Sequence, residues 1–327
     1  KFVITGLGSI GRRHFQNLLK LGFRDIAVVR RWSRADKPQK EFLAKFKPKV
    51  FYDLDAALRT RPDAVLVTNP TSLHIRTALQ ALRSGAHLFI EKPISHTRSG
   101  VDKLLKEARR RKKIIYVGYH FRHHPQLKFI KKCIASGALG KILSARFITG
   151  EYLPGWHPWE NYRRGYSARQ DLGGGVVLTQ SHDLDSASWF FGRPTAVIAR
   201  VANTRTFKID VDDIADMIFS FERCPAVYLH LDYLERPPVK RYTVTGSKGR
   251  LEWDYHRGAL HLIKPNGKVR AFKLPKGFRR NDMYLSEIRD FLSCIRSKRE
   301  TGEDAAKVLE MALRAKEASR GKRFLTF

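Results

Sequence analysis

The stretch KFVITGLGSIG, residues 1–11, decides how the first part of this chain folds. Its apolar beginning predicts a buried β-strand, and three glycines follow in a G-x-G-x-x-G pattern that leads into a helical segment. In a strand–turn–helix unit, the first glycine allows a tight turn, the second lets a pyrophosphate approach the backbone, and the third lets the helix pack on the strand. The N–H groups at the start of the helix would face the phosphates. The pattern predicts a dinucleotide site formed by Gly6, Gly8, Ser9, Ile10 and Gly11.

The next hundred or so residues repeat the alternation of short apolar runs and helical patterns. Such alternation is typical of a parallel sheet whose strands are joined by crossover helices. We predict strands at 1–6, 25–30, 64–69, 87–92 and 114–119, and helices at 11–22, 72–85 and 99–112. The fold class expected for residues 1–120 is therefore an α/β Rossmann domain with a doubly wound parallel sheet.

The regular alternation of strand and helix patterns ends after Tyr119. A helix at 125–137 and a strand at 141–150 lead into a long aromatic loop, which a helix carrying His182 follows. Strand-like segments with tight-turn signals then occupy 196–274, and two helices close the chain at 282–296 and 303–319. This pattern predicts an α+β domain with an open, mainly antiparallel sheet over residues 121–327. It leaves open that the C-terminal helix packs back on the first domain.

The net charge of the chain is +32, from 63 Lys and Arg against 31 Asp and Glu. A charge of this size attracts polyanions, so nucleic acid or a phosphorylated substrate is one interpretation, and a solvated basic surface is the other. The densest run, RRRKK at 109–113, closes a predicted helix, where the helix dipole favours cations. No RNA-binding motif, zinc-finger spacing or helix–turn–helix pattern accompanies the charge. We therefore expect a solvated surface and no specific nucleic-acid binding.

The cysteines and the apolar runs give expectations about the cellular compartment of the protein. Cys133, Cys224 and Cys294 lie far apart and form no C-x-x-C pair, which favours a reducing cytoplasm and predicts neither a disulfide frame nor a bound metal. No apolar run approaches the roughly 20 residues that a membrane span needs. The chain enters a strand almost at once, so we expect no signal peptide and no membrane association.

The end of the second predicted strand bears on cofactor choice. An acidic residue about 20 residues past the glycines would bind the ribose 2′-hydroxyl of NAD. This chain has VVRRWSR there, with Arg30, Arg31, Ser33 and Arg34 and no acid. A guanidinium pairs well with a 2′-phosphate, so NADP(H) is predicted over NAD(H). The alternative is that one or two of these arginines only face water.

Four further motifs narrow the family. They are VTNPTSLH at 67–74, HLFIEKPIS at 87–95, VGYHFRHHP at 117–125 and GGGVVLTQSHDLD at 173–185. Together with the N-terminal glycines, and in this order over almost the whole length, they resemble the Gfo/Idh/MocA (glucose–fructose oxidoreductase / inositol dehydrogenase) family. The stretch GEYLPGWHPWENYRRGYSAR at 150–169 is similar to sugar and nucleotide-sugar oxidoreductases of that family.

The resemblance implies roles for particular residues. In the family the lysine of the Glu-Lys-Pro motif touches both nicotinamide and substrate, which here is Lys92, and the bond before Pro93 is often cis. Tyr119 and Arg122 match a segment at the floor of the substrate cleft. The further positions that match the lining of the cofactor site are Thr68, Asn69, Pro70, His74 and Glu91.

The expected chemistry needs an acid/base at the reacting oxygen. Oxidation of a sugar alcohol requires a base for the hydroxyl proton as hydride leaves the carbon, and histidine titrates near neutral pH. We predict His182 as this acid/base, and Lys92, buried and with a lowered pKa, as the group that orients the oxygen or relays a proton. The alternatives are a core histidine and a surface lysine.

The aromatic loop is the predicted substrate-binding segment, because aromatic faces stack on sugars and arginines clamp phosphate or carboxylate. A small core under a long loop is the alternative. The residues concerned are Trp156, His157, Trp159, Tyr162, Arg163, Arg164 and Tyr166.

One departure from the family pattern, just before His182, weakens the expected acid/base mechanism. In many relatives an acid stands three or four residues before the histidine, where this chain has Thr179 and Leu178. Thr179 can position a hydroxyl or a water but cannot act as a base near neutral pH. Thr179, His182 and Asp185 are spaced by three residues, so we expect them to share one flank of a single helix. Asp185 either orients the histidine or pairs with an arginine.

Several functions remain open at this stage. The leading one is an NADP-dependent oxidoreductase that acts on a hydroxyl or keto group of a sugar or nucleotide-sugar. The alternatives are a redox-neutral enzyme like the NAD-dependent glycosidases, a catalytically silent NADP-binding sensor, and a polyanion-binding protein. The free face of an antiparallel sheet predicts a homodimer or homotetramer.

Overall fold

The computed structural model describes residues 1–30, 36–158 and 160–327. These form two compact units, which are described separately below. The first comprises Lys1–His120 and Arg280–Ala306, and the second comprises Phe121–Arg279 and Lys307–Phe327. The two continuous ranges drawn from the sequence differ from these units because the segment from Arg280 to Ala306 returns to the first unit.

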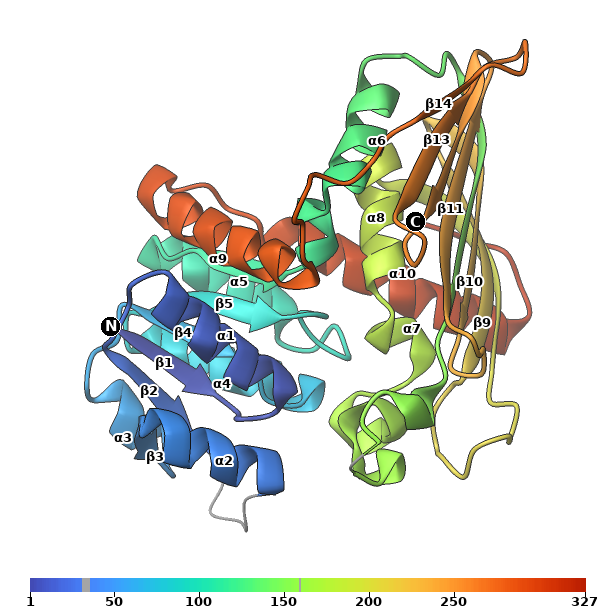
Figure 1. The fold of residues 1–327 in the computed structure, drawn as a ribbon. Helices are drawn as coiled ribbons and strands as arrows, with labels where there is room; N and C mark the ends of the chain where they lie inside the picture. Colours follow the sequence, from blue (N-terminus) through green and yellow to red (C-terminus); the bar gives the residue numbers. More distant parts are fainter. Residues whose placement is uncertain (31–35, 159) are drawn as a thin grey trace. The chain divides into compact units, whose positions relative to one another are not determined.

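The first unit is built on a parallel sheet with the strand order β3-β2-β1-β4-β5-β6 (Figure 1). Each pair of neighbouring strands is parallel, as a doubly wound domain requires. The strands are β1 (Phe2–Thr5), β2 (Ile26–Val29), β3 (Lys49–Phe51), β4 (Ala64–Val67), β5 (His87–Glu91) and β6 (Ile115–Gly118). The predicted Rossmann sheet is therefore confirmed, with β3 as an additional edge strand.

Helices cover the sheet of the first unit on both faces. They are α1 (Ser9–Lys20), α2 (Lys37–Phe46), α3 (Leu54–Leu58), α4 (His74–Arg83), α5 (Val101–Arg111) and α9 (Arg280–Ser297). Phe15 of α1 and Phe291 of α9 belong to one buried cluster with Phe2, Phe89 and Tyr116 of the strands. Burial of these aromatic rings on one sheet face fixes α1 and α9 there, and α4 packs against β4, β5 and α5.

The second unit contains a larger sheet with the order β14-β13-β12-β11-β7-β10-β9-β8-β15. The strands are β7 (Ile142–Gly150), β8 (Pro194–Ala202), β9 (Ile214–Phe221), β10 (Cys224–Asp232), β11 (Val239–Gly246), β12 (Gly249–Asp254), β13 (Ala259–Ile263), β14 (Val269–Ala271) and β15 (Leu325–Thr326). Its pairs are antiparallel except β7 with β10, which run parallel. The mainly antiparallel sheet is confirmed, and this parallel pair at its centre makes it mixed.

The helices of the second unit lie on one face of this sheet (Figure 1). They are α6 (Pro125–Ala135), α7 (Val176–Thr179) and α8 (His182–Phe191), and the last part of α10 (Gly302–Gly321) also belongs to this unit. Short 3₁₀ turns occur at 71–73, 120–123, 153–155, 162–164, 166–168 and 170–172. The single helix expected through Thr179 and His182 was wrong: the chain turns at Gln180, whose backbone N–H still bonds Val176 O, before α8 begins.

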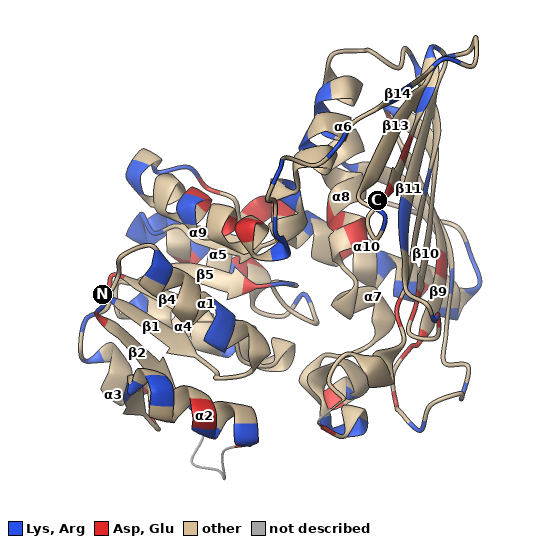
Figure 2. Cartoon of the chain, in the orientation of Figure 1, with Lys and Arg blue, Asp and Glu red and all other residues tan. Residues whose placement is uncertain are grey.

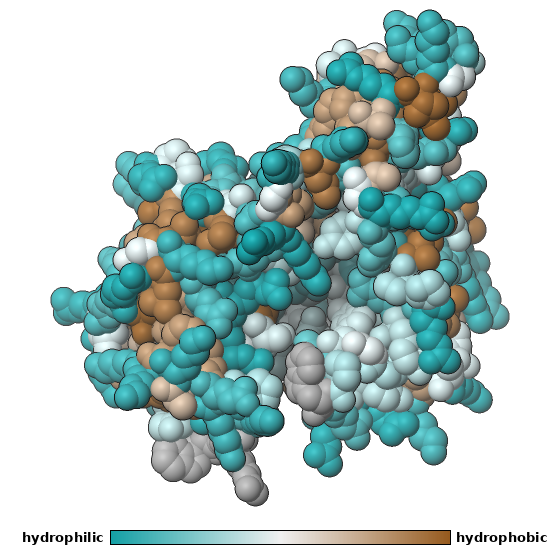
Figure 3. Space-filling model, viewed as in Figure 1, coloured by the Kyte–Doolittle hydropathy of each residue, from teal (hydrophilic) through white to brown (hydrophobic). Residues whose placement is uncertain are grey.

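The basic residues are spread over both units. Figure 2 shows Lys and Arg on helices and strands throughout, with Asp and Glu among them. In the RRRKK run, Arg110 and Arg111 contact Glu107 at 2.7 and 2.5 Å, and Arg109 contacts Glu303 at 3.1 Å. On the face seen in Figure 3, apolar atoms form only scattered patches among hydrophilic ones. Among the described helices, none has the length and apolarity needed to span a bilayer.

Candidate functional site

The glycine-rich turn between β1 and α1 is tightly built. Gly6 has a φ of +94°, a left-handed conformation that favours glycine. A Cβ on Gly11 would stand 2.2 Å from Gly6 O and 2.8 Å from the Thr68 hydroxyl oxygen. The single hydrogen of that hydroxyl is shared between Thr5 O at 2.8 Å and Gly6 O at 3.1 Å, and the Thr68 backbone N–H donates to Thr5 O at 3.0 Å. Thr68 therefore holds the turn together from the end of the neighbouring strand β4.

The same turn fits a dinucleotide phosphate. Gly8 is the N-cap of α1, and a Cβ built there would meet nothing within 4 Å. No described side chain caps the helix, and the first turn carries no acid, so the backbone N–H groups at Ser9, Ile10 and Gly11 point outward. An open space in front of N–H groups at a helix N-terminus is what a pyrophosphate requires. When bound there, a nicotinamide dinucleotide would supply the hydride acceptor or donor.

The Glu-Lys-Pro segment follows β5, two strands from the glycine turn in the sheet order. The Lys92–Pro93 peptide bond is cis, as the family resemblance implied. The Glu91 carboxylate lies 2.7 Å from Nε2 of the fully buried His14, and its other oxygen accepts the Lys92 backbone N–H at 3.2 Å. Helix α1 therefore braces the turn that presents Lys92, and Lys92 itself is half-buried.

His74 links this turn to the Thr68-Asn69-Pro70 turn. Its Nδ1 lies 2.9 Å from Pro93 O and its Nε2 lies 2.9 Å from Asn69 O. Burial is the main influence on this imidazole and lowers its pKa, and the two carbonyl oxygens act in the opposite direction. The Asn69 amide donates to the Thr77 hydroxyl at 2.8 Å. His74 therefore acts inside the wall of the site and holds two loops at a fixed separation.

The residues predicted to choose the cofactor are only partly described. Arg30 lies at the end of β2, where its backbone N–H donates to Phe51 O at 3.0 Å. Arg31, Ser33 and Arg34 lie outside the described residues, as does Trp159 of the aromatic loop.

The glycine-rich motif of the second unit places Thr179 at the end of α7. Gly174 packs against the aromatic loop, where a Cβ would stand 2.3 Å from Tyr166 O, and Asp212 caps α7 by accepting the Val177 N–H at 3.1 Å. Thr179 is buried, and so is Tyr233, whose hydroxyl donates to Ser167 O at 3.3 Å. Burial raises the pKa of Tyr233 well above its ordinary value. Thr179 therefore places a neutral hydroxyl at the buried end of α7.

His182 begins α8, and its ring lies 5.1 Å from the Phe121 ring in an edge-to-face contact. Asp185, one turn further on, is 1% exposed and forms a bidentate pair with Arg122, with N–O distances of 2.7 to 3.1 Å. Of the two alternatives for Asp185, the structure therefore shows the pairing with an arginine. The Arg122 guanidinium is committed to that pair. Tyr119, at the end of the first unit, is buried.

The aromatic loop packs on its own unit. The Trp156 ring lies 5.4 Å from the Tyr233 ring, and the Tyr162 ring lies 5.7 Å from Phe207. The Arg163 guanidinium lies 5.1 Å from the centre of the Tyr162 ring, and His157 contacts Glu160 at 3.9 Å. Tyr166 is half-buried and Arg164 is exposed. The loop is therefore an ordered layer, with the apolar underside that the alternative interpretation expected.

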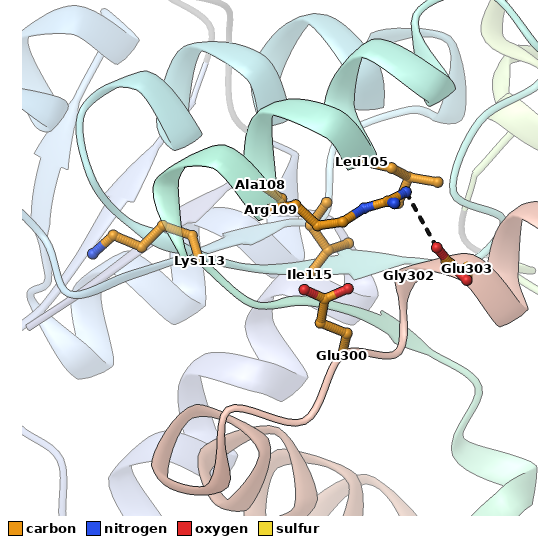
Figure 4. A pocket seen from close by; sticks show the side chains of 8 residues that line it. All are labelled: Leu105, Ala108, Arg109, Lys113, Ile115, Glu300, Gly302 and Glu303. Carbon is orange, nitrogen blue, oxygen red and sulfur yellow. Dashed lines mark ion pairs between the residues drawn. The ribbon is translucent and has the colours of Figure 1, made fainter.

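A small pocket in the first unit lies away from these motifs (Figure 4). It is lined by Leu105, Ala108, Arg109, Lys113, Ile115, Glu300, Gly302 and Glu303. Ile115 is the first residue of β6, so the pocket lies at the amino ends of the strands, whereas ligands of such sheets bind at the carboxyl ends. Within the described ranges, no cluster of His, Cys, Asp or Glu has the arrangement of a metal site.

Sequence reasoning missed three residues that support the site, which are His14, Lys240 and Asp183. His14 braces Glu91, and Lys240 of β11 pairs with Asp183, the neighbour of His182, at 2.8 Å. His14 stands one helical turn beyond Gly11, so its position on α1 was a usable signal. No local sequence pattern predicts the pairing of Lys240, because its partner Asp183 is 57 positions away.

Comparison with known proteins agrees with this arrangement. A family model described as an oxidoreductase family with an NAD-binding Rossmann fold matches residues 1–119, and one described as the Gfo/Idh/MocA C-terminal domain matches residues 127–252. Myo-inositol 2-dehydrogenase of Thermotoga maritima is 25% identical and covers 98% of this chain and 96% of its own. UDP-N-acetylglucosamine 3-dehydrogenase of Acidithiobacillus ferrooxidans is 24% identical and covers 96% of both.

The fold has close counterparts among solved structures. A levoglucosan dehydrogenase in complex with NADH and L-sorbose matches with a TM-score of 0.87 at 17% identity, over 99% of this chain and 98% of that one. The two family models cover both the glycine-rich domain and the sheet domain, and the relatives match end to end. The chain therefore belongs to the Gfo/Idh/MocA family of oxidoreductases, as its motifs indicated.

Proposed function

We propose that this oxidoreductase transfers hydride between NADP(H) and a hydroxyl or keto group of a sugar or nucleotide-sugar. The observation that carries the proposal is the braced turn at Lys92, which His14 and His74 hold at the carboxyl edge of the sheet that also carries the glycine-rich turn. A lysine held so firmly at this edge is suited to contact a reacting oxygen.

His182 and Lys92 share the proton chemistry in this proposal. As a C–H bond gives up hydride, His182 takes the hydroxyl proton, and in reduction it returns the proton to the alkoxide oxygen. The Lys92 ammonium donates a hydrogen bond to the same oxygen and stabilises the charge that develops on it. Thr179 takes no part as a base, since a threonine hydroxyl does not accept a proton near neutral pH. The site then works with one histidine where relatives use a histidine and an acid.

The sugar class rests on the relatives and on the aromatic loop. Proteins similar over the whole chain act on myo-inositol and on UDP-N-acetylglucosamine, as their names state. Trp156 has a buried indole N–H with no acceptor among the described residues, and Arg163 is exposed on the same loop. An indole donor and an exposed guanidinium suit a hydroxylated ligand that carries phosphate. Tyr119, His157, Tyr162 and Tyr166 remain proposed contacts of that ligand.

NADP(H) is proposed as the preferred cofactor because Arg30 and the residues after it supply cations and no acid. Fluorescence titration with NADPH and NADH tests this directly. We expect tighter binding of NADPH, and the Arg30→Ser protein is expected to lose most of the difference. A wild-type preference for NADH would contradict the proposal.

The activity is tested by NADP⁺ reduction against a panel of sugars, polyols and nucleotide-sugars. Lys92→Ala and His182→Asn are each expected to lower kcat at least 100-fold on the best substrate, with NADPH binding retained by His182→Asn. Arg110→Met, a surface change on α5, is the control. Unaltered turnover in either site variant would remove that residue from the mechanism. Tight NADPH binding with no turnover on any substrate would favour a sensor.

A homodimer or homotetramer is proposed to form through the outer face of the second unit's sheet. Ile198 and Ile218 are paired in register there and are 48% and 45% exposed, next to Tyr228. Paired exposed isoleucines favour burial against a second copy. Light scattering after size exclusion should give a multimer that Ile218→Asp dissociates. A cytoplasmic location is proposed from the three buried free cysteines.

A further inference from the structure

A buried ion pair lies directly behind the proposed acid/base, inside the second unit. Asp183, the residue after His182, is fully buried, and Lys240 of β11 is 3% exposed. The ammonium donates to both carboxylate oxygens at 2.8 and 2.9 Å and to the Thr149 hydroxyl at 2.9 Å. The carboxylate also accepts from Thr149 at 2.8 Å and from the Tyr242 hydroxyl at 2.7 Å. The cluster is therefore buried, and its charged groups hydrogen-bond one another.

Such a pair calls for an explanation. Desolvating two charges is so unfavourable that apolar residues of similar size often stabilise a core as well or better. Lys240 occupies an inward position of β11, where Tyr242 and Val244 follow on the same face and are buried. A lysine at an apolar position, with a matching aspartate on the helix above it, suggests a role other than stability alone.

Two routes connect this pair to His182. Along the backbone, Asp183 is the second residue of α8, so its bonds to Thr149 of β7 and to Lys240 fix the first turn of the helix on the sheet. Through side chains, the Lys240 ammonium lies 4.9 Å from the centre of the Phe121 ring, and the His182 ring lies 5.1 Å from the same ring. The pair is therefore connected to His182 in two ways, through the backbone of α8 and through the Phe121 ring.

We propose that Lys240 and Asp183 are positioning residues that hold His182 in place and, by cancelling each other's charge, set the pH at which it exchanges its proton. The proposal rests on the function proposed for His182. A charge on either residue without its partner would displace the proton affinity of His182, whereas the two opposite charges together largely cancel.

Other charged and titratable groups surround the same end of α8. Asp185 and Arg122 form their own neutral pair, and Tyr242 stays protonated because burial raises its pKa well above its ordinary value. His124 and Tyr255 pack on the Phe121 ring, and burial lowers the His124 pKa to about 4, so it is neutral over the range of interest. Neither Tyr242 nor His124 therefore changes its charge near neutral pH. Lys240→Met therefore changes the net charge of the region by one unit.

The test follows the imidazole titration of His182 by NMR in the full-length protein with saturating NADP⁺, with the His182→Asn protein assigning the signal. Lys240→Met leaves a bare carboxylate, still held by two hydroxyl donors, and should raise the titration midpoint of His182 by roughly one pH unit. Lys240→Gln, which retains a donor to Asp183 and is less prone to misfold, should shift it in the same direction. The double variant Asp183→Asn/Lys240→Met should return the midpoint to the wild-type value.

Arg241→Met is the matched control. Arg241 is the next residue of β11, on the opposite face, where it pairs with Asp254 at 2.8 Å. The Arg241→Met protein should have the same His182 titration midpoint as the wild type. A midpoint that stays constant or falls in the folded Lys240 variants, or a shift that survives in the double variant, would overturn the proposal. If His182→Asn retains turnover, the proposed function fails instead, while the midpoints still decide whether the pair controls the histidine.

Discussion

Replacement of Gly11 by alanine is a stringent test of the glycine-rich turn. The new Cβ would stand 2.2 Å from Gly6 O, and contacts of real Cβ atoms are essentially never under 3.0 Å. Helix α1 must therefore retreat by at least 0.8 Å from a turn that Thr68 holds by its hydroxyl and its backbone N–H. Overpacking of this kind costs about 2–3 kcal/mol, which lowers the Tm by roughly 5–10 °C. The same displacement should weaken NADPH binding at least tenfold, or about 1.4 kcal/mol.

The comparison variant is Gly8→Ala. Its Cβ meets nothing within 4 Å in the ligand-free structure and its φ is −67°, so alanine fits without strain. We expect an unchanged Tm for Gly8→Ala but a tenfold or greater loss of NADPH affinity, because the methyl group would occupy the space of the pyrophosphate. Calorimetric unfolding and fluorescence titration separate the two effects. Wild-type stability in Gly11→Ala, or wild-type affinity in Gly8→Ala, would refute this account of the turn.

Three other predictions concern the second unit. Asp185→Asn should lower the free energy of unfolding by about 2 kcal/mol in urea titrations, because the Arg122 guanidinium loses its buried counter-charge. Asp232 and then Asp216 raise the His230 pKa to about 9, so its stabilising contribution is complete below about pH 6.5 and disappears as the pH rises through 9. Burial lowers the His124 pKa to about 4, so its contribution is present above about pH 6.5 and disappears as the pH falls towards 4. Unfolding measured from pH 4 to 10 should show both declines, and His230→Asn should abolish only the alkaline one. Thr179→Asp should lower both stability and turnover, since the carboxylate would be buried against Tyr233; a strong rise in turnover would instead identify a site that has lost its acid.

The sequence alone was sufficient for elements with a strong local pattern. The glycine turn, five of the six strands of the first sheet and the hairpins after residue 195 were placed within a few residues, because each combines an apolar run with a turn signal. The segment from Lys37 to Leu58 was not assigned, because α3 has one turn and β3 is a half-exposed edge strand of three residues. Short elements at an edge bury too little to leave a clear periodicity.

The candidate site was predictable only where a motif carries it. Lys92 and His182 stand in recognisable motifs, but the partners that hold them are set by sheet register and helix packing. Arg122 and Asp185 are 63 positions apart, and His14 and Glu91 are 77 apart. The turn at Gln180 also escaped prediction, because the spacing of Thr179, His182 and Asp185 is equally compatible with one continuous helix. Pairings over such distances follow from tertiary structure and have no local pattern.

The return of α9 to the first unit bears on how the protein is made. Ile288, Phe291 and Cys294 complete the buried cluster that Phe2, Phe89 and Tyr116 begin, and the Tyr116 hydroxyl donates to Asp290 at 3.1 Å. During synthesis the N-terminal sheet therefore leaves the ribosome long before the helix that covers one of its faces. The nascent chain exposes an aromatic surface while the whole second sheet is still being translated, which makes it a natural client for chaperones. A chain that stops at residue 120 would lack α9 and would leave that aromatic surface uncovered.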